Sequence, residues 1–260
     1  MLNKEKIIKR ILKPIWKSWY WYISGRDKKE EIKFLNYGYA DNKDIELKAE
    51  DELERYPLQL YNYIASSINL ENLDILEVGC GRGGGASYVA RYLKPNSIKA
   101  VDISQKAINY CEKRYTSKNL EFIQADAERL PFKNESFDAV INVESSHCYP
   151  NISKFFSEVY RVLKPGGYFL YADFRNKKSI VNLEKSIDQT NFEKIKIENI
   201  TSQIVQALEK DDLRRVDLIN RLTPKFMRKA VMDFAGTKNS NTYESFLSGW
   251  NIYFFYALRK

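Results

Sequence analysis

His147 and Asp173 are the two residues of this sequence that could together remove a proton from a substrate. His147 is the only histidine among the 260 residues, and it follows an apolar run at residues 136–144. Asp173 ends the next apolar run. An unperturbed imidazole titrates near pH 6.5, and a carboxylate on its other nitrogen fixes its tautomer and stabilises its charged form. We therefore expect His147 to be a general base oriented by Asp173; the alternative is a histidine that only packs in the core.

A glycine-rich turn could hold a small charged ligand. Residues 74–88 read DILEVGCGRGGGASY, which is an apolar run, a turn and the start of a helical pattern. Gly79, Gly81 and Gly83 let a ligand approach the backbone, because no Cβ stands in the way. Glu77 would repel a pyrophosphate but suits a ligand that carries an ammonium group. A glycine-rich turn without a ligand is the alternative.

A second acidic residue, Asp102, follows the next short apolar run at residues 97–101. It stands about 20 residues after the glycine turn, an interval at which a carboxylate can accept both hydroxyls of a ribose. The alternative is an acid that only caps a helix or closes a turn.

The elements that must position these residues alternate along the chain. Apolar runs separated by helical patterns predict an α/β fold. Helices are expected at 49–69, 106–115 and 177–188, and a helical insert at about 201–240 is either ordinary core or a lid over the substrate. The expected strands are 74–78, 97–101, 120–124, 136–144, 168–173, 192–200 and 250–258.

The glycine turn, followed by DAERLPF at residues 126–132 and LKPGG at residues 163–167, resembles the class I methyltransferases. The resemblance implies a Rossmann-like sheet of seven strands, mostly parallel with an antiparallel last strand. It also implies S-adenosylmethionine as the cofactor, with Ile103 against the adenine, Asp126 and Ala127 capping that ring, and Asn142 near the methionine part. A solvated loop is the alternative for residues 126–132. The expected cofactor contacts are Glu77, Gly79, Cys80, Gly81, Gly83, Asp102, Ile103, Asp126, Ala127 and Asn142.

Three stretches carry a more specific resemblance: EVGCGRGGG at 77–85, NVESSHCYP at 142–150 and YAD at 171–173. They resemble the phthiotriolone-type lipid O-methyltransferases and related polyketide tailoring enzymes. The histidine and aspartate pair is also similar to that of sugar and natural-product O-methyltransferases. The resemblance implies methylation of a hydroxyl on an apolar small molecule in lipid or natural-product biosynthesis.

The aromatic segment FLNYGY at residues 34–39 is similar to one that closes over cofactor and substrate in several such enzymes. That similarity implies that Tyr37 and Tyr39 border the active site; the alternative is an aromatic turn packed in the core. Glu144 and Cys148 are expected to be structural.

Positive charge collects at the N-terminus. Ten Lys and Arg against four acids in residues 1–33 account for six of the eight net positive charges. The nearly neutral remainder argues against a nucleic-acid partner. In residues 4–24, apolar residues and tryptophans recur at helical spacing with Lys and Arg between them. This pattern predicts either a helix packed over the cofactor cleft or one lying on an anionic membrane surface. We expect residues 1–45 to form this cap and residues 46–260 to form the catalytic domain.

The three scattered cysteines indicate reduced thiols, and therefore a cytoplasmic protein. Such a protein could also bind peripherally at the membrane. No metal site is expected, because no ligand spacing suggests one. Two other functions stay open: a C-methyltransferase acting on a sterol-type or prenyl-type carbon, and a protein that binds S-adenosylmethionine without turnover and serves as a partner.

Overall fold

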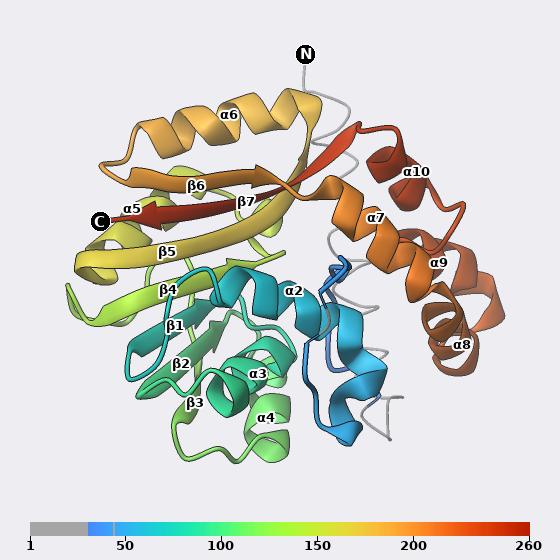
Figure 1. Ribbon diagram of the computed structural model, residues 1–260, viewed down its shortest axis with the longest axis horizontal. Helices are drawn as coiled ribbons and strands as arrows, with labels where there is room; N and C mark the ends of the chain where they lie inside the picture. Colours follow the sequence, from blue (N-terminus) through green and yellow to red (C-terminus); the bar gives the residue numbers. More distant parts are fainter. Residues whose placement is uncertain (1–30, 44) are drawn as a thin grey trace.

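The computed structural model describes residues 31–43 and 45–260, and it has a seven-stranded sheet at its centre (Figure 1). The strand order is β3-β2-β1-β4-β5-β7-β6. Strands β1 to β5 pair in parallel, and β7 is antiparallel to both β5 and β6. The predicted Rossmann-like fold is therefore confirmed. The strands are β1 Asp74–Val78, β2 Ser97–Asp102, β3 Leu120–Gln124, β4 Phe137–Val143, β5 Leu163–Asn176, β6 Glu193–Asn199 and β7 Asn251–Arg259.

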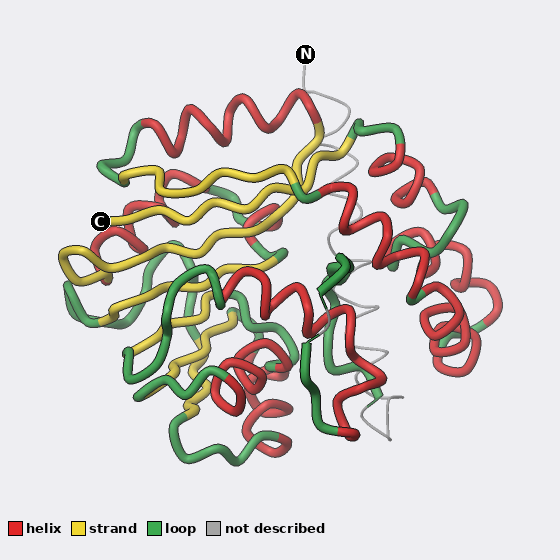
Figure 2. The backbone as a smooth tube through the Cα atoms, viewed as in Figure 1, coloured by secondary structure: helices red, strands yellow, loops and turns green. Residues whose placement is uncertain are grey.

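Helices cover both faces of the sheet, which gives three layers (Figure 2). Side chains from α2, α3, α4, α7 and α10 pack on one face, and those from α5 and α6 pack on the other. The helices are η1 Ala49–Glu54, α2 Arg55–Ala65, α3 Gly84–Tyr92, α4 Gln105–Arg114, η2 Ser146–Cys148, α5 Ile152–Val162, α6 Lys177–Asp188, α7 Thr201–Lys210, α8 Asp212–Leu222, η3 Lys225–Met227, α9 Arg228–Phe234 and α10 Asn241–Leu247.

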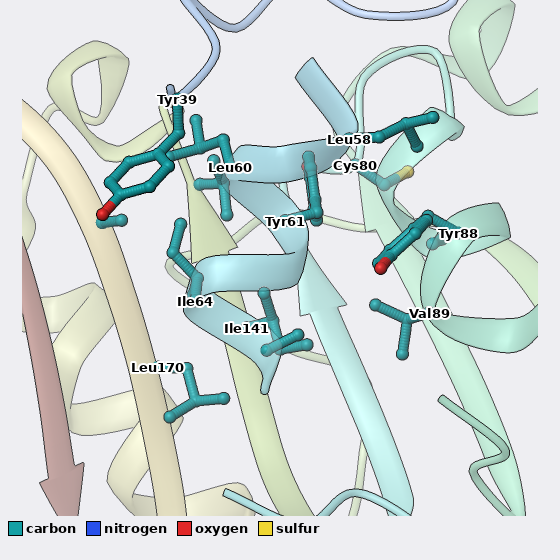
Figure 3. Packing of buried hydrophobic residues seen from close by; sticks show 14 of the residues in the cluster. Tyr39, Leu58, Leu60, Tyr61, Ile64, Cys80, Tyr88, Val89, Ile141 and Leu170 are labelled. Carbon is teal, nitrogen blue, oxygen red and sulfur yellow. The ribbon is translucent and has the colours of Figure 1, made fainter. Parts of the chain in front are cut away.

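The central strands are buried on both faces, as parallel strands in a three-layer fold must be. In β4, Ile141 faces the cluster built on α2 while Val140 faces the cluster built on α5. Figure 3 shows Ile64 of α2 lying near Ile141 and near Leu170 of β5. Because each strand is fixed from both sides, the carboxyl ends of β1, β2, β4 and β5 form a rigid edge for the site.

The N-terminal part of the described chain, residues 31–43, has no helix or strand but is largely buried between 36 and 40. We call residues 31–43 the strap. Its Tyr39 N–H donates to Tyr56 O of α2 at 3.0 Å, and its Ala40 N–H donates to Gln203 O of α7 at 3.1 Å. The strap therefore joins two helices that lie far apart in the sequence. The helical segment expected at residues 4–24 lies outside the described residues, and the boundary expected after residue 45 stays a prediction.

Two predicted elements differ from the structure by more than one residue at an end. The helix expected at 49–69 is divided into η1 and α2 and ends at Ala65. Pro57, which has no N–H to donate, stands in the first turn of α2, where a helix tolerates it but a continuous helix from residue 49 would lose a hydrogen bond. The strand expected at 168–173 is longer at both ends: it begins at Leu163, which pairs with Phe137 of β4, and it continues to Asn176, because its pairing with β7 continues to that residue.

Within residues 31–43 and 45–260, no helix combines the length and the apolar character that a membrane span requires. The same residues contain no cluster of three or more His, Cys, Asp or Glu side chains placed to hold a metal ion.

Candidate active site

Glu77 lies at the end of β1 with its side chain fully enclosed by protein. Its residue exposure is 1%. The Tyr61 hydroxyl of α2 donates to Glu77 Oε1 at 2.7 Å, whereas Oε2 has no hydrogen-bond partner among the residues that the structure describes. Burial raises the pKa of Glu77 to about 7, although the Tyr61 hydrogen bond opposes the shift. One carboxylate oxygen is therefore available to a ligand donor.

The glycine turn between β1 and α3 is packed closely against the protein itself. Gly79 has a φ of +79°, and a Cβ at this position would lie 2.7 Å from the Tyr149 hydroxyl and even closer to the Ser145 side chain. Gly83 caps α3 in the left-handed region with a φ of +75°. Close contacts within the chain and left-handed backbone therefore require glycine at these positions, and the approach of a ligand to them stays a prediction.

Asp102 lies at the end of β2, directly beside the glycine turn. Its carboxylate accepts the Gly81 N–H at 3.0 Å and the Ser104 N–H at 2.8 Å. Burial raises its pKa, and these two backbone donors oppose the shift. The next residue, Ile103, is 69% exposed, so an apolar surface stands beside the acid. The binding of a ribose by Asp102 and of its base by Ile103 stays a prediction.

The remaining expected cofactor residues have local roles. Asn142 is buried at the end of β4, where its amide donates to Val78 O at 2.7 Å, and its Oδ1 has no partner within the described residues. Asp126 is exposed and accepts the Glu128 N–H at 2.9 Å, so it closes a turn. Ala127 and Cys80 are buried. Their contacts with a cofactor stay predictions.

The structure brings His147 and Asp173 into direct contact. His147 Nδ1 lies 2.8 Å from Asp173 Oδ1, and the His147 backbone N–H donates to Asp173 Oδ2 at 2.9 Å. Asp173 has no exposed surface, while the His147 side chain keeps 30% of its surface exposed. The imidazole is thus held by one nitrogen and open on one side, which is the geometry that a general base needs.

The charges in this pair perturb both pKa values. Burial lowers the pKa of His147, but the Asp173 charge outweighs that effect and raises the pKa above its ordinary value of 6.5. Burial opposes ionisation of Asp173, yet the charges of His147 and Arg175 hold the pKa of this carboxyl well below its usual range. The carboxylate therefore stays ionised across the whole working range of pH.

Tyr37 of the strap lies beside this pair, and Tyr39 does not. The Tyr37 N–H donates to Glu144 at 2.8 Å, and its ring centroid lies 5.5 Å from that of Phe174, which in turn lies 4.6 Å from the His147 ring. Tyr39 instead stacks on Tyr63 at 4.2 Å. The strap thus reaches the candidate site through Tyr37.

Residues that the sequence did not single out complete the site. Tyr61 holds Glu77, and Tyr253 donates to Glu144 at 2.9 Å. Arg175 pairs with Asp173 at 3.2 Å. Only Arg175 has a local signal, because it stands two positions after Asp173 and so faces the same side of β5.

Fold and site together define a class I methyltransferase: a doubly wound sheet with a buried acid near the end of β1, a second acid at the end of β2, and a histidine after β4 in contact with an aspartate in β5. The methyltransferase domain family matches residues 76–171. The chain is 37% identical over 250 residues to the phthiotriol/phenolphthiotriol dimycocerosates methyltransferase of Mycobacterium tuberculosis, covering 95% of this chain and 93% of the relative. It therefore belongs to the S-adenosylmethionine-dependent methyltransferases, as the sequence motifs predicted.

Two further proteins show how far the likeness extends. A fatty-acid O-methyltransferase of Mycolicibacterium smegmatis is 38% identical over 243 residues, covering 93% of this chain and 88% of the relative. The solved structure of geranyl diphosphate C-methyltransferase from Streptomyces coelicolor A3(2), determined with S-adenosyl-L-homocysteine, has a TM-score of 0.63 at 17% identity. It covers 90% of this chain and 94% of that one, and at this identity the likeness concerns the fold alone.

Proposed function

We propose that this methyltransferase transfers its methyl group to a hydroxyl of an apolar, lipid-type molecule, with His147 as the general base and Asp173 as the group that orients it. The observation that carries the proposal is the 2.8 Å contact between His147 Nδ1 and Asp173 Oδ1. Because Nδ1 is held by the carboxylate, Nε2 is the atom that takes the hydroxyl proton. The acceptor oxygen would bond to the methyl carbon as the carbon–sulfur bond breaks, which leaves S-adenosylhomocysteine.

The cofactor residues support this assignment. S-adenosylmethionine, when bound, supplies an electrophilic methyl group on a sulfonium sulfur. The unpaired Glu77 Oε2 fits the ammonium group of such a ligand. Each Asp102 oxygen already accepts one backbone N–H, and its second lone pair can accept a ribose hydroxyl. Asn142 Oδ1 is a second buried acceptor that a ligand donor would satisfy.

An apolar acceptor is favoured by the aromatic side chains beside the base. Phe174, Tyr37 and Phe246 come from β5, the strap and α10, and their ring centroids lie between 5.2 and 5.6 Å from one another. Phe174 adjoins the base, with its ring centroid 4.6 Å from that of His147, and the buried Tyr37 and Phe246 pack behind it. The names of the relatives, which include a fatty-acid O-methyltransferase, point to the same class of acceptor.

The test is His147→Ala, assayed with hydroxylated lipids and fatty acids by mass spectrometry. We expect the rate of methyl transfer to fall by about 10²–10⁴-fold, the usual contribution of a general base. Affinity for S-adenosylmethionine, measured by calorimetry, should stay nearly constant, because the cofactor contacts lie elsewhere. The rate of the parent should rise with pH through the pKa of His147, and the variant should lose that rise. Near-parental turnover would make His147 a packing residue and favour a carbon or amine acceptor.

A further inference from the structure

Arg175 lies behind the candidate base in a network that the reaction, as described so far, does not use. It stands near the carboxyl end of β5, on the same face as Tyr171 and Asp173. Its Nη1 lies 3.2 Å from Asp173 Oδ2, and its Nη2 donates to Ser146 Oγ at 2.9 Å. Only 13% of the side chain is exposed. A buried guanidinium thus spans the strand that carries Asp173 and the loop that carries His147.

The two oxygens of Asp173 are divided between different partners. Oδ1 accepts from the His147 ring at 2.8 Å and from the Phe174 N–H at 2.8 Å. Oδ2 accepts from Ser146 Oγ at 2.6 Å and from the His147 N–H at 2.9 Å, and it faces Arg175. Since Arg175 also holds Ser146, the carboxylate cannot rotate without breaking several hydrogen bonds. Its Oδ1 is thereby kept in line with the imidazole.

The charge of Arg175 also matters to the imidazole. A buried carboxylate with no other cation nearby would favour the protonated imidazole strongly, and a base that already holds a proton cannot accept another. A second cation on the same carboxylate opposes that effect.

We propose that Arg175 is a positioning residue for the base: it shares Asp173 with His147, fixes the carboxylate through Ser146, and lets the imidazole release its proton more readily than Asp173 alone would allow. This inference rests on the proposed role of His147 as the general base. Arg175 itself touches no reacting atom in the proposed reaction.

Other titratable groups face the imidazole, and the experiment must separate them from Arg175. Glu144 approaches from the end of β4, and burial raises its pKa to about 7. The Cys148 thiol adjoins the ring from η2, while the Tyr253 hydroxyl and the Tyr37 backbone N–H both donate to Glu144. The pKa of Glu144 is therefore about 7, whereas for His147 the Asp173 charge outweighs burial and raises the pKa to about 10. A rate profile reports both groups, so the imidazole has to be observed directly.

The chain makes this observation simple, because it has one histidine. In tag-free protein, the imidazole signals in an NMR titration belong to His147 without further assignment. We expect Arg175→Gln to raise the pKa of His147 by about one unit, the low end of the effect of a neighbouring charge. The rising limb of kcat against pH should move by the same amount, so the rate at pH 7 should fall about tenfold and recover at higher pH. Arg175→Lys, which keeps the charge and loses the planar fork, should leave the pKa near the parental value.

The outcomes separate the two proposals. An unchanged pKa of His147 in a folded Arg175→Gln protein refutes the role of Arg175, and so does a rate loss that is equal at every pH. A shifted imidazole pKa with an unmoved rate profile shows that Arg175 affects the imidazole but refutes His147 as the base, and with it the role of Arg175 in positioning that base. If Arg175→Gln does not fold, Arg175→Lys decides alone, since a shift of a full unit with the charge retained contradicts the proposal.

Discussion

Replacing Glu77 by Gln should make the protein more stable at pH 8 while weakening its hold on the cofactor. Glu77 is 1% exposed, and burial raises its pKa to about 7 from an ordinary 4.5. The folded protein therefore binds a proton here more tightly than the unfolded chain does. The stability that this adds is fully present below pH 4.5 and is lost as the pH rises through 7.

The size of the effect follows from the same shift. When the pKa of Glu77 rises from 4.5 in the unfolded chain to about 7 in the folded protein, the protein loses about 3 kcal/mol of stability as the pH increases from below 4.5 to above 7. A glutamine has no charge to desolvate. From pH 5 to pH 8, the free energy of unfolding of Glu77→Gln should therefore rise relative to that of the parent by up to about 3 kcal/mol. Its amide nitrogen would take the place of an oxygen that lacks a partner, so the absolute gain will be smaller than the change with pH.

The assay is urea denaturation of both proteins at pH 5 and pH 8, together with calorimetry of S-adenosylmethionine binding. The matched control is Glu158→Gln, because the Arg161 hydrogen bond lowers the pKa of Glu158 and its contribution hardly changes between these two values. A difference between Glu77→Gln and the parent that is the same at both pH values would refute the reasoning. Undiminished cofactor affinity would remove Glu77 from the site.

Three further predictions use other parts of the chain. Asp102→Ala should weaken cofactor affinity by about 5- to 150-fold, the equivalent of 1–3 kcal/mol for donors left unpaired, and calorimetry showing no change would exclude Asp102. Gly79→Ala should cost more stability than Gly249→Ala, because both have left-handed backbones but only Gly79 has the Tyr149 hydroxyl at 2.7 Å from an added Cβ. Equal losses in denaturation would contradict this. Deleting residues 1–24 should abolish binding to anionic vesicles at low salt, and an intact protein that does not bind them leaves only the packed-helix interpretation.

The sequence was sufficient for the fold because its strongest patterns are local. Strand β4, FDAVINV, has six of its seven residues buried, and a run of this kind can only be a central strand once turns bound it on both sides. The pairing of His147 with Asp173 was predictable for the same reason, since carboxyl ends of adjacent parallel strands meet at one edge. Bounds were less predictable: β5 extends past Asp173 because a partner strand some 80 residues later pairs with it.

The parts that escaped prediction are contacts between residues distant in the sequence. Tyr61 and Glu77 are 16 residues apart, and Tyr253 and Glu144 are 109 apart. No spacing rule connects such pairs, because tertiary packing alone brings them together. Arg175 is different: its place two residues after Asp173 on a strand was visible, but an arginine near a strand end is ordinarily a solvated charge, and only the burial of its side chain indicates otherwise.

The glycine turn is a weaker indicator of a ligand than the acid that precedes it. Close packing against Tyr149, and of Gly85 against the Tyr61 ring, accounts for glycine at those positions whether or not anything binds. Packing does not explain why a glutamate stands at position 77. Its buried Oε2 has no donor, which costs about 1–3 kcal/mol, and an apolar residue of similar size would avoid that cost. A ligand that brings its own ammonium group removes the cost on binding. The buried Glu77 oxygen is therefore stronger physical evidence for the cofactor than the glycine turn is.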